Sequence, residues 1–353
     1  MRSWKLPEIH RFPTGKVPPD SLKRLVLSRL GVLSDRVLQG PSVGEDAAVL
    51  DMGDKVLVVA TDPITGASGS VGWLVVHVNA NDVASCGARP LWFLCVTLLP
   101  EGADDDVLDG IMVQMDAACR EVGVSLIGGH TETTPGLDRP ILVGFMMGEA
   151  AKGEYVTTGG ALPGDAVIMT KTAGIEGTAV LATDLADVLG SRVDEDVLGR
   201  AEALLGSISV VPEAMRAVEV GGVHSLHDPT EGGVLNGVWE MAEAAGTGVI
   251  INEEDIPVRR ETRLICAALG INPLKVLGSG ALLMTVDPGK SGEIVSALRE
   301  IGVKASVIGE IKPLEEGRVL VRRDGSRIDI EAVEQDHLYK VLDEYGMGEK
   351  DEV

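Results

Sequence analysis

The chain carries acidic residues at repeated points where a strand-like run ends or a helical pattern begins, each set among small residues. The five segments read Gly44-Glu45-Asp46-Ala47-Ala48, Thr61-Asp62, Asn81-Asp82, Gly128-Gly129-His130-Thr131-Glu132 and His227-Asp228-Pro229-Thr230-Glu231-Gly232-Gly233. Carboxylates on such tight turns suit divalent cations around a polyphosphate, because Mg²⁺ takes oxygen ligands and bridges a few carboxylates to substrate phosphates. The pattern therefore predicts a fold that gathers these turns, and an enzyme that uses ATP with Mg²⁺.

Charge and composition narrow the classes of partner. The 353 residues are long enough for two domains, and 45% of them are hydrophobic. Asp and Glu number 54 against 31 Lys and Arg, which gives a formal net charge of −23. This balance argues against nucleic-acid partners and anionic membrane surfaces, since both need clustered positive charge. A chain this acidic needs metal ions to mask the repulsion if it binds ATP.

The sequence also indicates a soluble, cytoplasmic protein. It contains no run of about 18 apolar residues, the length that a membrane-spanning helix needs. Residues 1–9 lack the apolar core of a signal peptide. The four cysteines, Cys86, Cys95, Cys119 and Cys266, form no C-x-x-C pair and are expected to be buried free thiols.

The mixed order of strands and helices predicts an α+β fold of two domains. In the first half, apolar periodicity predicts helices at 21–30, 72–86 and 107–122 and strands at 47–50, 56–60, 91–98, 124–127 and 141–147. A glycine-rich stretch at 148–164 is the expected boundary, so the domains span 1–155 and 156–353. The second half predicts strands at 166–170, 248–251, 281–286 and 303–308, helices at 175–185, 195–205, 212–218, 233–245 and 291–301, and a hairpin of 319–321 with 328–330.

Two of the acidic turns border predicted strands. Gly44 allows the backbone beside Asp46 to approach a phosphate closely. Asp62 follows the strand at 56–60, so its side chain would emerge at the edge of a sheet. For Asp46 the alternative is a solvated turn, and for Asp62 it is a helix cap or a turn-forming aspartate. The residues alone leave these interpretations open.

The third segment lies inside an otherwise apolar helical pattern. Asn79, Asn81 and Asp82 stand within four positions, and such residues disfavour helix interiors because their side chains compete for backbone hydrogen bonds. A bound ligand would offset that cost. The alternative is a buried polar cluster that binds no ligand.

The last two segments are rich in glycine. Gly128-Gly129 can present N–H groups to an anion, and His130 or Glu132 could reach a metal-bound water; the alternative is a turn with a surface histidine. Gly232-Gly233 opens a predicted helix whose N-terminus favours anions, with Asp228 at the same pole; the alternative is an ordinary cap. The phosphate-binding order G-x-x-x-x-G-K-[ST] is absent, and no Cys/His spacing indicates zinc.

Taken together, these segments resemble the superfamily that contains aminoimidazole ribonucleotide synthetase, thiamine-monophosphate kinase, selenophosphate synthetase and the hydrogenase-maturation protein HypE. The resemblance runs from Gly44 to Gly309 in the family's order. Its motifs are Asn81-Asp82-Val83-Ala84-Ser85-Cys86-Gly87-Ala88-Arg89-Pro90, similar to the family's N-D-[IV]-A-x-x-G-A-x-P, and Asp228-Pro229-Thr230-Glu231-Gly232-Gly233, similar to the HypE version of a second motif.

The resemblance implies an N-terminal mixed-sheet domain that pairs in a homodimer and a C-terminal α/β domain. ATP and Mg²⁺ would lie in the cleft, partly along the dimer interface. By motif, the implied metal ligands are Asp46, Asp62, Asp82, Glu132 and Asp228, of which Asp46, Asp82 and Asp228 would be catalytic. The implied cofactor contacts are Gly44, Asp62, Asn81, Gly128, Gly129, His130 and Thr131.

The sequence departs from these relatives in two places. HypE proteins carry a carbamoyl group on a cysteine in their C-terminal tail, whereas the last cysteine here is Cys266, and no cysteine precedes Cys86 to match the reactive one of selenophosphate synthetases. After Gly128-Gly129 the family continues with Asp or Glu, whereas this chain has His130. Either Glu132 takes the metal role or this metal site is weaker.

Members of the superfamily activate a substrate oxygen with the ATP γ-phosphate or phosphorylate the substrate outright. The resemblance therefore implies a HypE-like, Mg²⁺-dependent enzyme acting on an oxygen of a small molecule or of a partner protein's group. One alternative is a small-molecule kinase like thiamine-monophosphate kinase. Another is a non-catalytic, nucleotide-binding maturation or scaffold protein.

Overall fold

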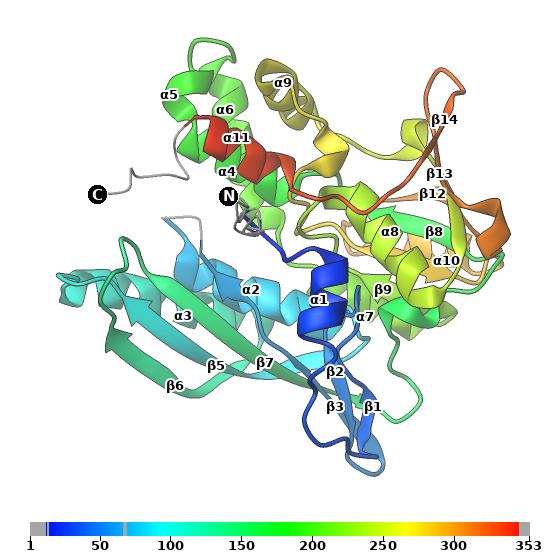
Figure 1. Cartoon of the computed structure of the whole chain (residues 1–353), viewed down its shortest axis with the longest axis horizontal. Helices are drawn as coiled ribbons and strands as arrows, with labels where there is room; N and C mark the ends of the chain where they lie inside the picture. Colours follow the sequence, from blue (N-terminus) through cyan, green and yellow to red (C-terminus); the bar gives the residue numbers. More distant parts are fainter. Residues whose placement is uncertain (1–11, 13, 66–68, 346–353) are drawn as a thin grey trace, which may run out of the picture.

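In the described part of the chain, the strands form two sheets of seven, one in each half of the sequence (Figure 1). The computed structural model describes residues 12, 14–65 and 69–345. The first sheet has the order β1-β2-β3-β7-β5-β6, with β4 beside β7, and only β5 and β6 pair in parallel among these described strands. Its strands are β1 (Val37–Gln39), β2 (Ala48–Asp51), β3 (Lys55–Ala60), β4 (Pro63–Ile64), β5 (Arg89–Leu99), β6 (Ser125–Thr133) and β7 (Ile141–Ala151).

The second sheet has the order β14-β13-β10-β12-β8-β11-β9. It comprises β8 (Ala166–Thr170), β9 (Val223–His227), β10 (Gly248–Asn252), β11 (Leu283–Val286), β12 (Ala305–Lys312), β13 (Arg318–Val321) and β14 (Arg327–Asp329). Strands β10 and β13 are parallel, and the predicted hairpin is the antiparallel pair β13–β14. The predicted two-domain α+β fold is confirmed, and the proposed boundary at 155/156 lies in the segment between β7 and β8.

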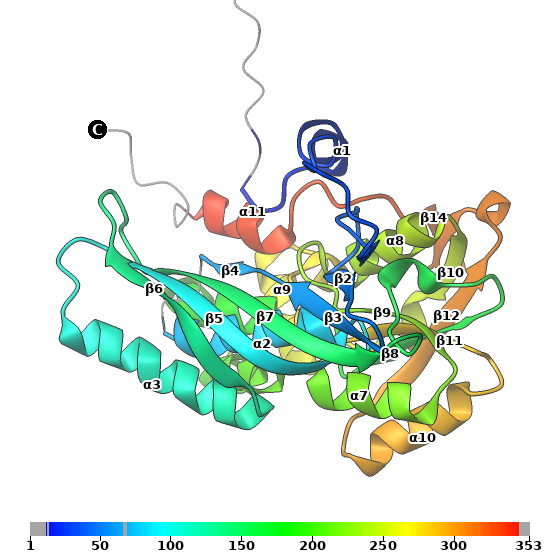
Figure 2. The same cartoon turned by 90° about the horizontal axis from the view of Figure 1, so that it is seen from below.

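Helices cover one face of the first sheet and both faces of the second (Figure 2). The α-helices are α1 (Pro19–Leu25), α2 (Val71–Ala84), α3 (Asp105–Val122), α4 (Ile175–Asp184), α5 (Ala186–Leu189), α6 (Glu195–Glu202), α7 (Val211–Val220), α8 (Gly233–Ala245), α9 (Arg260–Leu269), α10 (Ser291–Glu300) and α11 (His337–Glu344). Short 3₁₀ segments are η1 (Thr158–Gly160), η2 (Ala203–Ser207), η3 (Glu253–Asp255), η4 (Pro273–Lys275) and η5 (Leu314–Glu316).

Alternation along the central strand β8 explains how the second sheet is covered. Successive side chains of a strand point to opposite faces. Val167 and Met169 pack in the apolar cluster that includes α8, whereas Ile168 packs in the cluster that includes α7 and α10. A strand buried on both faces must be apolar throughout, which matches the sequence Ala-Val-Ile-Met-Thr.

Helix α2 is buried along nearly its whole length, because its apolar residues occur on every side. It packs against β7 at Gly144 and Gly148, where the strand offers no side chains to keep the helix away. A Cβ on Gly144 would collide with the amide of Asn79 and lie 2.9 Å from the ring of Phe93. Gly144 therefore makes room for the Asn79 amide, and Gly148 makes room for Val83.

Several predictions from the sequence differ from the structure. The strand predicted at 124–127 extends to Thr133 as β6. The prediction of a turn at 128–132 is therefore wrong. Parallel pairing with β5 continues through Thr133, and a Cβ on Gly129 would collide with the carbonyl of Cys95. The helix predicted at 21–30 ends at Leu25, and α1 has no buried residue to hold a further turn. Strand β9 and helices α9 and α11 were not predicted.

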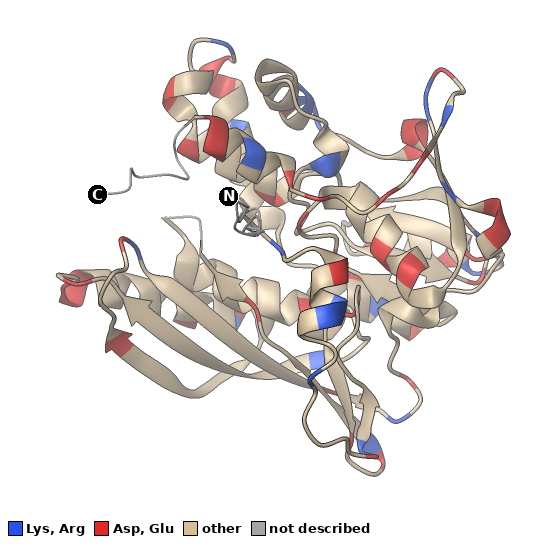
Figure 3. Cartoon of the chain, viewed as in Figure 1, with Lys and Arg blue, Asp and Glu red and all other residues tan. Residues whose placement is uncertain are grey.

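Acidic side chains are distributed over both halves of the molecule, with Lys and Arg between them (Figure 3). Within the described ranges, no helix has both the length and the apolar character needed to cross a membrane.

Substitution of Gly144 by alanine tests the close packing of α2 on β7. We expect Gly144→Ala to lower the free energy of unfolding by about 2 to 3 kcal/mol, because the added methyl overpacks a filled core. Gly110→Ala on the exposed side of α3 is the matched control, since a Cβ there meets open space. It should raise stability by about 0.5 to 1 kcal/mol. Equal effects in chemical denaturation would contradict this account of the packing.

Candidate functional site

The four predicted aspartates, Asp46, Asp62, Asp82 and Asp228, come together where the two halves of the chain meet; we call them the four-aspartate cluster. They reach this place from four different elements. Asp46 precedes β2, Asp62 follows β3, Asp82 lies on α2 and Asp228 follows β9. Burial raises the pKa of Asp82 well above its usual value, and the charges of the other three aspartates raise it further.

Asp228 provides the most informative single atom. The residue is only 1% exposed. Its Oδ1 accepts a hydrogen bond from the Ser85 hydroxyl at 3.4 Å, whereas its Oδ2 is buried with no hydrogen-bond partner in the described residues. Burial, followed by the charge of Asp46, raises its pKa well above the usual range. Because buried polar atoms are nearly always satisfied, this oxygen is a place where a cation or an ordered water would bind.

A buried histidine holds Asp46 in place. His227 Nδ1 lies 2.9 Å from Asp46 Oδ2, and its Nε2 lies 3.0 Å from Glu240 Oε2. Each ring nitrogen faces a carboxylate, so both carry protons and the imidazole is cationic. Burial alone would lower the pKa of His227, but the two carboxylates raise it well above its usual value. His227 thus links the first sheet to α8 and partly neutralises the cluster.

The turn before β2 is fixed by Glu45. Its carboxylate oxygens accept backbone N–H groups of Thr158 (3.1 Å) and Gly159 (3.0 Å) at the start of η1. Gly44 adopts a φ of +85°, and a Cβ there would lie 2.9 Å from the carbonyl of Glu240. Glycine is therefore required for close packing beside Asp46, and the acidic neighbour Glu45 serves as an anchor between the two halves.

The two asparagines on α2 hold the surrounding backbone. Asn79 accepts the N–H of Asp62 at 2.8 Å and donates to the Asp62 carbonyl at 3.1 Å. Asn81 donates to the carbonyl of Ile208 at 2.9 Å and accepts the N–H of Val210 at 2.8 Å. These hydrogen bonds satisfy the side-chain amides of both asparagines, which are unusual residues for the interior of an apolar helix. Both ends of the Asn81 side chain are used, so it braces the site rather than offering it a free polar atom.

The glycine-rich segment Gly128, Gly129, His130, Thr131 and Glu132 does not join the cluster within one chain. It lies on β6, at the opposite edge of the first sheet from β1 and β2, and it is exposed throughout. His130 Nε2 lies 3.0 Å from Glu132 Oε2, and Thr134 donates to the other oxygen of Glu132. The hydrogen bonds from His130 and Thr134 lower the pKa of Glu132, so this carboxylate stays ionised.

Lys16 and Glu240 are further charged residues of the site that the sequence did not single out. The Lys16 Nζ donates to the Thr230 hydroxyl at 3.0 Å. Desolvation lowers its pKa, but the charges of Glu240, Asp62, Glu231 and Asp46 outweigh this and raise it above the usual value. No local pattern marked these residues, because the N-terminal segment reaches the cluster only through tertiary contacts.

The carboxylate oxygens of the four-aspartate cluster are of the kind that Mg²⁺ takes as ligands. In the part of the chain that the structure describes, no three His, Cys, Asp or Glu side chains form a ready-made metal centre. Mg²⁺ does not need one, since it keeps several waters and binds through one or two carboxylates together with substrate phosphates. The orphaned Asp228 oxygen and the neighbouring aspartates therefore fit a cation that arrives with a polyphosphate.

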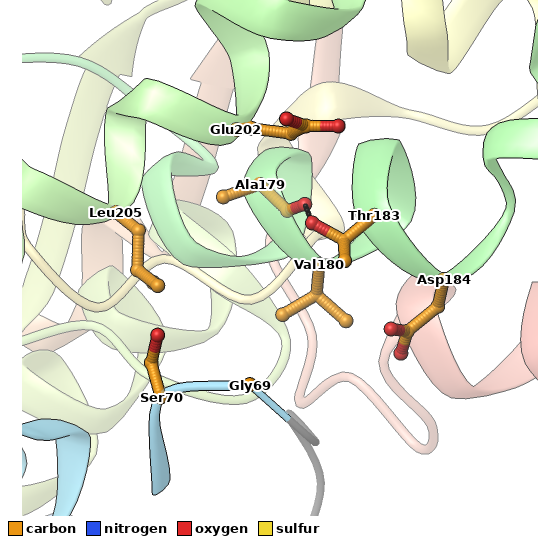
Figure 4. A pocket seen from close by; sticks show the side chains of 8 residues that line it. All are labelled: Gly69, Ser70, Ala179, Val180, Thr183, Asp184, Glu202 and Leu205. Carbon is orange, nitrogen blue, oxygen red and sulfur yellow. Dashed lines mark hydrogen bonds between the residues drawn. The ribbon is translucent and has the colours of Figure 1, made fainter. Parts of the chain in front are cut away.

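A separate small pocket lies between Ser70 at the start of α2 and Ala179 and Thr183 of α4 (Figure 4). Its volume is about 70 Å³, well below the roughly 300 Å³ at which ligand pockets begin. None of the four aspartates lines it. At this volume the pocket is too small to hold a nucleotide.

Asp228→Asn should stabilise the metal-free protein by about 1 to 3 kcal/mol, because it removes a buried charge whose Oδ2 has no hydrogen-bond partner in the described residues. The folded pKa of Asp228 is raised, so the folded state holds a proton that the unfolded state has lost. Stability is then lost as pH rises through the raised pKa. The gain from Asp228→Asn in urea denaturation with EDTA should accordingly be larger at about pH 8 than at about pH 4.

Asp116→Asn on α3 is the control, because Arg120 lowers the pKa of this exposed carboxyl. It should give a slight loss of stability instead. Destabilisation by Asp228→Asn at high pH would contradict the unsatisfied-charge account.

Comparison with known proteins places the chain in a family. The profile described as AIR synthase related protein, N-terminal domain, matches residues 44–150, and that of the C-terminal domain matches residues 163–322. A putative hydrogenase expression/formation protein of Methanocaldococcus jannaschii is 29% identical over 322 residues, covering 89% of this chain and 93% of that protein. Carbamoyl dehydratase HypE of Cupriavidus necator is 31% identical over 276 residues, or 75% of each protein.

Solved structures share the whole two-domain arrangement. A chain of the HypE–HypF complex aligns with a TM-score of 0.74 at 23% identity, covering 89% of this chain and 99% of that one. HypE in complex with ATP gives a TM-score of 0.70 at 24% identity, covering 93% and 98%. AaThiL complexed with AMPPCP and TMP gives 0.64 at 22% identity, covering 82% and 91%. The resemblance predicted from the motifs is confirmed: the chain belongs to the AIR synthase related protein family of ATP-dependent enzymes and is HypE-like in sequence.

Proposed function

We propose that this chain binds ATP with Mg²⁺ at the four-aspartate cluster and uses the γ-phosphate to phosphorylate, or to activate by phosphorylation, an oxygen of an acceptor. The observation that carries the proposal is the buried Oδ2 of Asp228, which has no partner in the described residues. A cation that bridges to phosphate oxygens would supply the missing ligand. Support also comes from HypE, a relative that has been solved in complex with ATP.

The chain's own residues divide the work of binding. Asp82 and Asp228 are the most buried members of the cluster and would hold the cation. Asp46 and Asp62 would place two further negative charges around the cation. His227 orients the side chain of Asp46, and Asn79 holds the backbone of Asp62. When bound, Mg²⁺ neutralises charge on the phosphates and favours in-line transfer to the acceptor.

The cysteines of the chain bear on the identity of the acceptor. All four are buried. Burial raises the pKa of Cys86 and Cys95, that of Cys119 to about 11 and that of Cys266 to about 12. Only a thiolate is an effective nucleophile or group carrier, so none of these cysteines is suited to carry a carbamoyl group into the site. We infer that the acceptor oxygen is not carried by any of these four cysteines.

Two kinds of acceptor agree with this inference. One is a group on a partner protein, as suggested by the name carbamoyl dehydratase and by the HypE–HypF complex. The other is a small molecule, as in thiamine-monophosphate kinase, which shares the fold. A kinase leaves the phosphate on its product, whereas a dehydratase releases it as free phosphate. The location of the phosphate after turnover would therefore separate the two.

The outer face of the first sheet supports pairing with a second copy of the chain. A groove of about 550 Å³ on this face is lined by apolar side chains with charged ones beside them. The apolar residues are Met52, Leu57, Trp92, Ile127 and Met147, and the charged ones are Asp54, Lys55 and Glu149. Beside it, β6 is an edge strand that pairs only with β5 in the described chain. Exposed edge strands and large apolar patches mark interaction surfaces. In a homodimer, His130 and Glu132 on β6 could contribute to the partner's site.

Calorimetric titration with a non-hydrolysable ATP analogue tests the nucleotide site. We expect Mg²⁺-dependent binding to the wild type, and Asp82→Asn should weaken it about tenfold or more because a charged contact is lost. Asp116→Asn makes the same chemical change on exposed α3 and should leave the affinity unchanged. A folded wild type that binds no nucleotide, or binds it equally well without Mg²⁺, would exclude the proposed function.

Mixed dimers test whether β6 acts across the interface. Asp82→Asn and Glu132→Ala homodimers should both bind nucleotide weakly. A heterodimer purified with two different tags should regain one tight site, because one of its sites then carries both changes and the other carries neither. Calorimetric stoichiometry gives the count. A heterodimer without any tight site would show that Glu132 does not act in the partner's site.

A further inference from the structure

Lys16 belongs to an N-terminal segment that is held over the site by specific contacts. Its backbone N–H donates to Glu231 Oε2 at 2.6 Å. Gly15 makes this approach possible, because a Cβ there would lie 2.6 Å from the same oxygen and 3.1 Å from the ring of Tyr339 on α11. Figure 2 shows this segment passing beside α11 before it enters α1. On α1, Lys23 forms an ion pair of 2.8 Å with Glu243 of α8.

The Lys16 ammonium faces more negative charge than it neutralises. Glu240, Asp62, Glu231 and Asp46 all act on it electrostatically. Its hydrogen bond to Thr230 uses one of three N–H donors, and within the described residues no carboxylate forms a direct ion pair with it. The Lys16 ammonium therefore has unused donors and acts electrostatically on Asp228, whose Oδ2 has no hydrogen-bond partner in the described residues.

We propose that Lys16 is a built-in counter-cation of the site, which balances the four-aspartate cluster when no metal is bound and donates to the phosphate oxygens of a bound Mg²⁺–nucleotide. The proposal rests on the proposed function and adds a phosphate-binding residue to it. An ammonium suits this role because it is a compact charge with three rotatable donors on a flexible stem.

If Lys16 has this role, removing its charge should change the affinities for free metal and for the metal–nucleotide complex in opposite directions. A divalent cation alone competes with the ammonium for the same carboxylates, so Lys16 weakens binding of the free metal. A nucleoside triphosphate brings several negative charges with the metal, so the same ammonium strengthens binding of the complex. A side chain that only held the fold together would weaken both kinds of binding when it was removed.

The experiment measures Mn²⁺ alone and an Mg²⁺-bound, non-hydrolysable ATP analogue, by calorimetry on full-length wild type and Lys16→Gln. We expect Lys16→Gln to tighten Mn²⁺ binding about three- to tenfold and to weaken nucleotide binding about tenfold or more. Lys16→Arg keeps the charge and should restore most of the nucleotide affinity. Arg24→Gln removes the same charge from exposed α1 and should change neither affinity.

Unchanged Mn²⁺ affinity in Lys16→Gln, or a parallel loss of both affinities, would overturn the proposal. So would an equal effect of Arg24→Gln, because net charge would then explain the result. Failure of the proposed function has a different signature, since the wild type itself would not bind the Mg²⁺–nucleotide. The comparison with Mn²⁺ alone would still report whether Lys16 competes with a cation at the cluster.

Discussion

Negative charge concentrated at the junction of two sheets is the constraint around which this molecule is organised. Asp82 and Asp228 are almost fully buried, and burial raises the pKa of both. A structure that keeps such groups together loses stability unless cations or donors compensate. His227 and Lys16 offset part of this negative charge. One oxygen of Asp228 still has no hydrogen-bond partner in the described residues.

The contacts that hold this charge in place also hold the two halves of the chain together. Asn81 bonds the backbone at Ile208 and Val210, Glu45 bonds the start of η1, and His227 bonds Asp46. Each contact joins a group from the first half to one from the second. The geometry of the cluster is therefore coupled to the docking of the two sheets, so a change at the junction should alter ligand binding without touching an aspartate.

The sequence singled out four aspartates that lie near one another in the structure, because acids beside glycine or alanine at the ends of periodic segments are local signals. Their role as metal ligands stays a prediction. The unusual polar residues within the apolar pattern of α2 were also visible locally. Which of them bond to the backbone and which faces the other aspartates was not. Asn79 and Asn81 bind backbone, and Asp82 faces the cluster. Which residue takes which role depends on neighbours far away in the chain.

Residues that depend on distant pairing could not be predicted in this way. Gly128-Gly129 has the composition of a turn, but its pairing with β5 makes it a strand. His227, Glu240 and Lys16 reach the site only after β9, α8 and the N-terminal segment have docked, and β9 itself was not predicted. Sequence periodicity reports on one element at a time, whereas the compensation of charge at the junction is a property of the whole fold.

Co-crystallisation with Mn²⁺ and a non-hydrolysable ATP analogue tests the central claim most directly, because the anomalous signal of manganese locates the cation independently of any activity. We predict a manganese peak within coordination distance of Asp228 Oδ2 and bridging to the nucleotide phosphates. Nucleotide bound with its cation elsewhere, leaving the Asp228 oxygen without a ligand, would contradict the assignment of the four-aspartate cluster as the metal site.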